Sequence, residues 1–189
     1  MEIKTIKVYN FNELSTDAQE KAINDYYENE DYFFLNDDLE EELWQIDNYF
    51  YDTQIYYSLS YSQGDGLCLS GTFDLENWLK DEYNFKQSIN DAVHNLVYSV
   101  ESKINRRYSF ASKSDILVET YYNLYKYPNL EELIDSIIDD IEDYYMDLCN
   151  KLELYGYSIL DYRMDNVEFS DYADENGILY LSNGKQWNL

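Results

Sequence analysis

Apolar residues recur at helical spacing in several segments of the chain. The longest is 129–154, where Asn129 and Glu132 fit an N-terminal capping pattern. Its inner face contains only apolar and aromatic positions: Leu130, Leu133, Ile134, Ile137, Ile138, Ile141, Tyr145, Leu148 and Leu152. Similar spacing predicts helices over 16–29, 37–50 and 84–105, and a short helix near 74–82.

Alternating and β-branched runs predict strands in other parts of the chain. Residues 54–62 and 67–73 flank a Gly-Asp-Gly turn, which favours an antiparallel hairpin. The remaining segments that we expect to be β-structure are 3–9, 107–111 paired with 116–122, 157–170 and 178–182. Helices that alternate with antiparallel hairpins indicate an α+β fold. We expect a single domain spanning 1–189, with a soft division near residue 128.

The net charge of the chain says more about its possible partners than its length does. The chain has 189 residues, of which 39 are Asp or Glu and 13 are Lys or Arg, so its formal net charge is −26. Because 45% of the residues are hydrophobic and 18% are aromatic, this is not a disordered acidic tail. A sequence pI of about 4.1 excludes direct binding to DNA, RNA or anionic lipid, whose phosphates would repel it.

The location of the protein follows from other features of the sequence. No apolar run approaches the ~20 residues that span a bilayer, and the charged start is not followed by an apolar signal segment. Two cysteines, Cys68 and Cys149, do not make a disulfide framework. We therefore expect a cytoplasmic protein with two buried, reduced thiols, in the host cytoplasm if a phage encodes it.

The acidic side chains gather in two blocks. Residues 1–60 and 129–189 each hold 15 acidic and 3 basic side chains, a net charge of −12, whereas 61–128 carry only −2. Within the last block, eight carboxylates lie opposite the apolar stripe of the long helix: Glu131, Glu132, Asp135, Asp139, Asp140, Glu142, Asp143 and Asp147. The first block repeats the pattern at Asp37, Asp38, Glu40, Glu41 and Glu42.

These acidic faces have two interpretations. One is an ordinary solvated helix surface. The other is a surface that imitates a polyanion, because helical steps of four residues place carboxylates about 6 Å apart, near the spacing of phosphates along a nucleic-acid strand. Like charges at this spacing weaken a helix, and the sequence places no lysine to relieve them. Both blocks are therefore candidate partner-binding surfaces.

Enzymatic motifs are missing. The chain contains neither Gly-x-x-x-x-Gly-Lys-Ser/Thr nor Gly-x-Gly-x-x-Gly, and His94 is its only histidine. One histidine and two unpaired cysteines do not make a zinc site or a nucleophilic triad. We therefore expect no catalytic residue, no metal and no cofactor, although a glycosidase-like pair of carboxylates stays open among so many acids.

Three short segments resemble a known group of proteins. Phe11-Asn-Glu-Leu-Ser15, Ala18-Gln-Glu-Lys-Ala22 and Ser62-Gln-Gly-Asp-Gly66 are similar to segments of small acidic proteins encoded by bacteriophages of low-GC bacteria. The likeness covers mainly the first 75 residues and identifies no binding residue. It implies a viral counter-defence protein of the anti-CRISPR or DNA-mimic kind, while some members of the group carry an antitoxin-like label.

The combined expectation is a non-enzymatic inhibitor. Its acidic helices would occupy the basic nucleic-acid groove of a host CRISPR effector, or alternatively of a restriction enzyme, with 131–147 as the main contact and 37–42 as the second. The rival hypothesis is an antitoxin-like or assembly module that binds its partner through tyrosine-rich hairpins. The sequence leaves the oligomeric state and the identity of the partner open.

Overall fold

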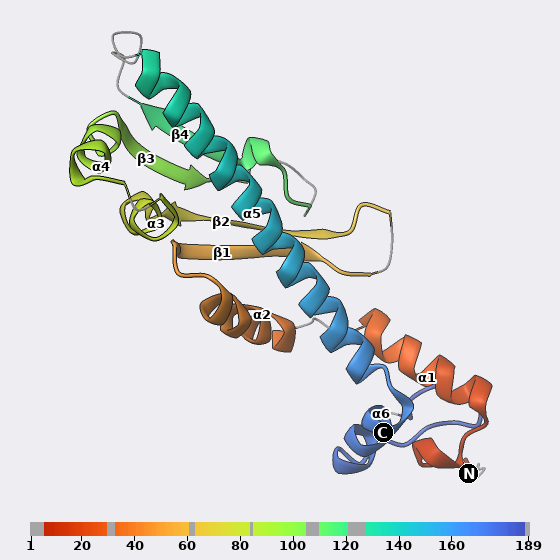
Figure 1. Cartoon of the computed structure of the whole chain (residues 1–189). Coiled ribbons are helices and arrows are strands. Elements are labelled where there is room, and N and C mark those ends of the chain that lie inside the picture. Colours follow the sequence, from red (N-terminus) through yellow and green to blue (C-terminus); the bar gives the residue numbers. More distant parts are fainter. Residues whose placement is uncertain are drawn as a thin grey trace. The chain divides into compact units, whose positions relative to one another are not determined.

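The computed structural model forms two compact units (Figure 1). It describes residues 6–29, 33–60, 63–83, 85–104, 110–120 and 128–187. Unit 1 combines Met1–Phe33 with Tyr157–Leu189, and unit 2 comprises Phe34–Gly156. Residue 128, where the sequence suggested a soft division, lies inside unit 2 at the start of a helix. Helices and an antiparallel sheet together confirm the α+β fold.

Unit 2 is built on a four-stranded sheet with the order β1-β2-β3-β4. Its strands are β1 (Phe50–Ser58), β2 (Gly66–Phe73), β3 (Val97–Ser102) and β4 (Ile116–Thr120). All neighbouring pairs are antiparallel. In the β1–β2 hairpin, which the Gly-Asp-Gly turn predicts, Ile55 lies opposite Leu69. This hairpin is confirmed, with each strand within a few residues of the expected bounds.

The segment expected to be a long helix over 84–105 is divided between a helix and a strand. Helix α4 (Gln87–His94) is followed by its C-cap Asn95, and β3 begins two residues after this cap. Val97 and Val100 have helical spacing, but an irregularity in the β3–β4 register lets both be buried from a strand. Strand β4 pairs with β3, and 107–109 of the segment expected to pair with it lie outside the described residues.

Helix α2 (Phe33–Ile46) begins and ends four residues earlier than the expected 37–50. The buried carboxylate of Asp47 accepts hydrogen bonds from the backbone N–H groups of Tyr49 (3.2 Å) and Phe50 (2.9 Å). These bonds turn the chain out of the helix, so that Phe50 starts β1 instead of ending α2.

The short helix expected near 74–82 is present in two parts. Helix α3 (Leu75–Trp78) is capped by Asp74, whose side chain accepts from the N–H of Asn77 at 3.0 Å. A π-helical turn, η2 (Leu79–Tyr83), follows it directly. Turns of this type are rare and frequently occur at functional sites.

Helix α5 (Pro128–Arg163) crosses the sheet of unit 2 and ends nine residues later than expected (Figure 1). The ring of Tyr145 lies 6.0 Å from that of Phe50, and its hydroxyl donates to the carbonyl of Leu69 at 3.1 Å. Gly156 does not end the helix. A Cβ at this position would lie 2.6 Å from a methyl group of Leu59, so the glycine serves close packing.

Unit 1 packs η1 (Phe11–Glu13), α1 (Thr16–Asn29) and α6 (Asn166–Glu175) around an aromatic core. The rings of Phe11 and Phe169 meet edge to face at 5.0 Å. Ala18, Ala22 and Ile23 on the inner face of α1 are buried in this core. Of the strand expected over 3–9, the described residues show only a β-bridge between Tyr9 and Tyr180.

The β-structure expected over 157–170 is wrong. This segment continues α5 and then forms α6, whose start is capped by Asp165 through the N–H of Val167 at 2.8 Å. Gly177, with φ of 62°, follows the end of α6. Its N–H donates to the backbone carbonyl of Asp174, and the N–H of Ile178 donates to the backbone carbonyl of Ala173. Asp165 and Gly177 are recognisable start and stop signals in the sequence. In 178–182, only the bridges of Tyr180 are β-structure.

In the described part of the chain, no helix combines the length and the apolar character needed to cross a membrane.

Candidate functional site

The acidic face of α5 is the largest surface that the sequence predicts, and the helix presents it as expected. Pro128 starts the helix, where the missing N–H of proline costs nothing, and Glu131 in the first turn is favourable to the helix dipole. The apolar stripe packs inward: Ile134, Ile137, Ile141, Tyr145, Leu148 and Leu152 are all buried. At 100° per residue, the eight carboxylates cover about half of the helix circumference, opposite this stripe.

Seven of the eight carboxylates are exposed, and Glu142 is half-buried. From Glu131 to Asp147 the row extends about 24 Å along the helix axis at 1.5 Å per residue. All eight belong to unit 2, so the row is a property of one compact unit.

The expectation that no lysine relieves this row is wrong. Lys113, in the 3₁₀ turn η3 (Lys113–Asp115), places its Nζ 2.5 Å from Asp143 Oδ1 and 3.9 Å from a Glu142 carboxylate oxygen. Lys151 pairs with Asp147 at 2.6 Å, one helical turn away. The hydrogen bond to Asp143 raises the pKa of Lys113, so this lysine stays charged. The C-terminal half of the row is therefore partly neutralised.

The N-terminal half of the row is different. Within the described residues, no hydrogen bond or ion pair engages the side chains of Glu131, Glu132, Asp135 and Asp139. No described residue offsets their charge by direct contact, and Lys113 acts only on Asp139, at longer range, so this half presents a negative surface to an approaching partner.

The second acidic block lies on α2. Asp37, Glu40 and Glu41 are exposed, whereas Asp38 and Glu42 are half-buried. The last two face the C-terminal part of α5: after burial, the charges of Glu42, Asp38 and Glu41 raise the pKa of Tyr155 on that helix. The structure therefore brings this block next to α5, although away from the 131–139 half of the row.

Trp44 adds an exposed aromatic side chain to the acidic surface of α2. It follows Glu41 by three residues and Glu40 by four, on the same helix face, and 76% of its surface is exposed. Leu154 on α5 is 70% exposed. Leu39 and Leu43 form the buried face of α2, and Trp44 lies off this face.

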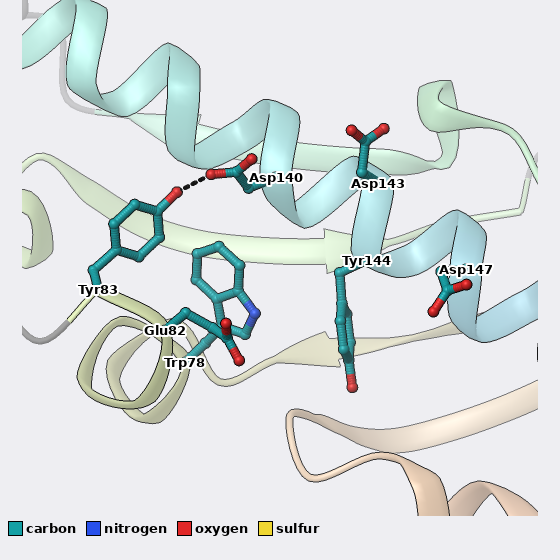
Figure 2. Close-up of a pocket in the computed structure, with 7 residues that line it drawn as sticks. All are labelled: Trp78, Glu82, Tyr83, Asp140, Asp143, Tyr144 and Asp147. Carbon is teal, nitrogen blue, oxygen red and sulfur yellow. Dashed lines mark hydrogen bonds between the residues drawn. The ribbon is translucent and has the colours of Figure 1, made fainter.

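A pocket opens beside the middle of α5 (Figure 2). It has a volume of about 510 Å³ and is lined by Trp78, Glu82, Tyr83, Asp140, Asp143, Tyr144 and Asp147. Three of these residues belong to the predicted acidic row. The other residues from α3 and η2 were missed, because nothing in the sequence connects 78–83 with 140–147.

Hydrogen bonds set the walls of this pocket. The hydroxyl of Tyr83 donates to Asp140 Oδ2 and that of Tyr144 donates to Asp47 Oδ1 at 2.6 Å. Burial first, and then these hydrogen bonds, raise the pKa of both tyrosines well above the ordinary value. Both hydroxyls are therefore neutral donors at physiological pH, and the carboxylates supply the charge of the pocket.

The remaining candidates for chemistry are a metal site, the two cysteines and the single histidine. Among the described residues, no group of three or more His, Cys, Asp or Glu side chains lies in positions that could hold a metal ion. Neither Cys68 nor Cys149 forms a disulfide, and both are buried, as expected. Burial raises the pKa of the Cys149 thiol to about 12, which opposes a nucleophilic role. The side chain of His94 lies outside the described residues.

Comparison with models of protein families, with curated proteins and with solved structures finds no match for this chain.

Proposed function

We propose that this protein is a non-enzymatic inhibitor whose acidic helix α5 occupies the basic, nucleic-acid-binding groove of a partner protein. A phage counter-defence role would make that partner a host CRISPR effector in the first instance and a restriction enzyme in the second. The observation that carries the proposal is the row of exposed carboxylates, which extends about 24 Å along one helix.

The spacing of the row favours a groove built for phosphates. Successive acids at four-residue steps lie about 6 Å apart, and single-strand phosphates are separated by a comparable distance. The rigid helix holds these charges in place, so little conformational entropy is lost on binding. A net charge of −26 would also steer the encounter with a basic surface and make its rate depend on salt.

The pairing of the carboxylates indicates where the main contact lies. Glu131, Asp135 and Asp139 are exposed and have no hydrogen-bond or ion-pair partner among the described residues, whereas Asp143 and Asp147 would have to leave their lysines. We therefore place the centre of the contact on the N-terminal half of α5. The α2 block, Asp37–Glu42, is a second contact.

A charge-reversal pair tests the proposal. The test variant combines Glu131→Lys, Asp135→Lys and Asp139→Lys. The control combines Asp171→Lys, Asp174→Lys and Glu175→Lys at exposed positions of α6, which changes the net charge equally. Each protein is expressed in bacteria with an active CRISPR system, where escape of a targeted plasmid measures inhibition. A parallel strain with a restriction enzyme and unmodified phage DNA tests the second partner class.

We expect the control to inhibit like the original protein and the α5 variant to lose inhibition. Equal inhibition by both variants, with circular dichroism showing both folded, would rule out the mimic. Loss of activity in both would mean that total charge matters and not the α5 row. Either result would overturn the proposal.

A second candidate is favoured by the exposed Trp44 and Leu154. An antitoxin-like or assembly module would bind through such apolar contacts, and its affinity would barely respond to salt. The acidic mimic should instead bind less tightly by one or more orders of magnitude between low and physiological salt. The affinity for the partner, measured at several salt concentrations, separates the two candidate functions.

A further inference from the structure

The pocket beside α5 combines aromatic walls with carboxylates from two different elements (Figure 2). Trp78 ends α3, Glu82 and Tyr83 belong to η2, and Tyr144 and Asp147 come from α5. All lie in unit 2. Its volume of about 510 Å³ is in the range of ordinary ligand pockets.

The carboxylates do not contribute equally. Figure 2 shows the carboxylate of Asp143 pointing away from Trp78, and this group pairs with Lys113. Asp140 is held by the Tyr83 hydroxyl, and Asp147 pairs with Lys151 in a contact where both side chains are more than half exposed. Glu82 has no ion-pair partner among the described residues. The pocket is therefore negative and lacks an internal cation.

An unsatisfied donor lies in the wall. Trp78 is only 3% exposed, and its indole Nε1 has no hydrogen-bond partner among the described residues. Figure 2 shows this nitrogen on the ring edge that faces Tyr144, beside Glu82. Leaving a buried N–H without a partner is unfavourable, so it calls for an oxygen acceptor. A simple cation cannot supply one.

We propose that this pocket binds an arginine residue of a protein partner, with the guanidinium among Glu82, Asp140 and Asp147 and a peptide carbonyl oxygen accepting from Trp78 Nε1. The planar guanidinium can stack on Tyr83 or Tyr144 and donate to more than one carboxylate at once, which the ammonium of lysine cannot do. An arginine in a peptide carries both required features, a cation and a nearby carbonyl.

This inference rests on the proposed function in one respect: the arginine would belong to the basic groove of the partner protein. The pocket itself would act as the anchor of that contact, since buried aromatic pockets that take arginine are typical binding hot spots. The acidic row would then attract the partner over a distance, and the pocket would fix the position in which the partner binds.

A small probe tests the pocket without the partner. Nα-acetyl-arginine amide is titrated into ¹⁵N-labelled protein, and the indole N–H signals of Trp44, Trp78 and Trp187 are followed by NMR. Trp44→Phe and Trp187→Phe assign the Trp78 signal without altering the pocket. Guanidinium chloride, Nα-acetyl-lysine amide and sodium chloride at the same ionic strength serve as comparisons.

We expect a saturable downfield shift of the Trp78 indole proton with the arginine probe, and smaller or non-saturable changes with the three comparisons. Glu82→Gln and Asp147→Asn should each weaken probe binding about two- to fivefold, whereas Asp135→Asn, outside the pocket, should not. No saturable shift at Trp78, or lysine binding as tightly as arginine, would overturn the inference.

The two proposals fail separately. The Glu131, Asp135 and Asp139 triple variant should still bind the arginine probe, because none of these residues lines the pocket. If it binds the probe and also inhibits normally, the mimic is wrong and the pocket stands. If the probe does not bind the original protein while the triple variant loses inhibition, the pocket is wrong and the mimic stands.

Discussion

The hydroxyl of Tyr144 on α5 donates a 2.6 Å hydrogen bond to Oδ1 of Asp47, which precedes β1. Asp47 is only 7% exposed and also accepts from the N–H groups of Tyr49 and Phe50. One carboxylate therefore ends α2, starts β1 and holds α5 in position. Since Tyr144 also lines the pocket, the same contact sets one of the pocket's aromatic walls.

Tyr144→Phe should destabilise unit 2, because it removes a partner from a buried carboxylate. We expect the free energy of unfolding to fall by about 1.5–3 kcal/mol, the usual range for hydrogen bonds to charged groups. Urea denaturation followed by circular dichroism measures this change. Tyr51→Phe, at an exposed tyrosine on β1, is the matched control and should be near neutral. Equal stability of the two variants would contradict the role of the Tyr144 hydroxyl.

Gly184→Ala should disrupt unit 1. Gly184 has φ of 83°, and a Cβ there would lie 2.2 Å from the carbonyl oxygen of Ala18 on α1. Neither backbone can yield easily, so we expect a loss of more than about 2 kcal/mol. Gly177→Ala is the control: φ is 62°, but the added Cβ meets open space, and only about 1 kcal/mol should be lost. Thermal unfolding midpoints that rank the two in reverse would refute this packing argument.

Unit 1 should lose stability in alkali through Tyr180. This side chain is 3% exposed, and burial, followed by the charge of Tyr172, raises its pKa from 10.0 to about 12. A raised folded-state pKa gives stability that is complete below pH 10 and is lost as the pH rises through 12. The loss should reach about 2–3 kcal/mol.

Urea midpoints at pH 8, 10 and 11 test this prediction. Tyr180→Phe should show a smaller alkaline decline than the original protein, although it starts from its own baseline. Tyr83, Tyr144 and Tyr145 also have raised pKa values and should maintain part of the decline. An unchanged slope in Tyr180→Phe would exclude this residue as a cause.

The Cys149 thiol should be inert in the folded protein. It is fully buried, and with a pKa of about 12 only about one part in ten thousand is thiolate at pH 8. Ellman's reagent should therefore react at the rate of unfolding, and it should detect two thiols only after denaturation. Cys68→Ala isolates the Cys149 signal. Rapid reaction of Cys68→Ala under native conditions would show that the thiol is accessible.

The elements that sequence patterns predicted well are those with a strong local signal. The inner stripe of α5, from Ile134 to Leu152, needs no tertiary information, and the turn around Gly64 and Gly66 is sufficient to define the β1–β2 hairpin. Val97 and Val100 were misassigned because an irregular strand and a helix can give the same apolar spacing.

The candidate site was predictable only in part. The exposed carboxylates of α5 follow from the inner stripe, since they lie on the opposite face. Lys113, Trp78 and Glu82 reach α5 through folding of the sheet and its connections, which no local pattern encodes. This is why the sequence overstated the free charge of the row and missed the pocket.

Unit 1 draws on both ends of the chain, Met1–Phe33 and Tyr157–Leu189, whereas unit 2 is continuous. During synthesis, unit 2 can complete its sheet before the C-terminal segment leaves the ribosome. The partner segments of α1 then arrive more than a hundred residues later, a separation that slows closure. The acidic row and the pocket therefore lie on unit 2, the unit that can fold first. A nascent chain that still lacks α6 would already carry both.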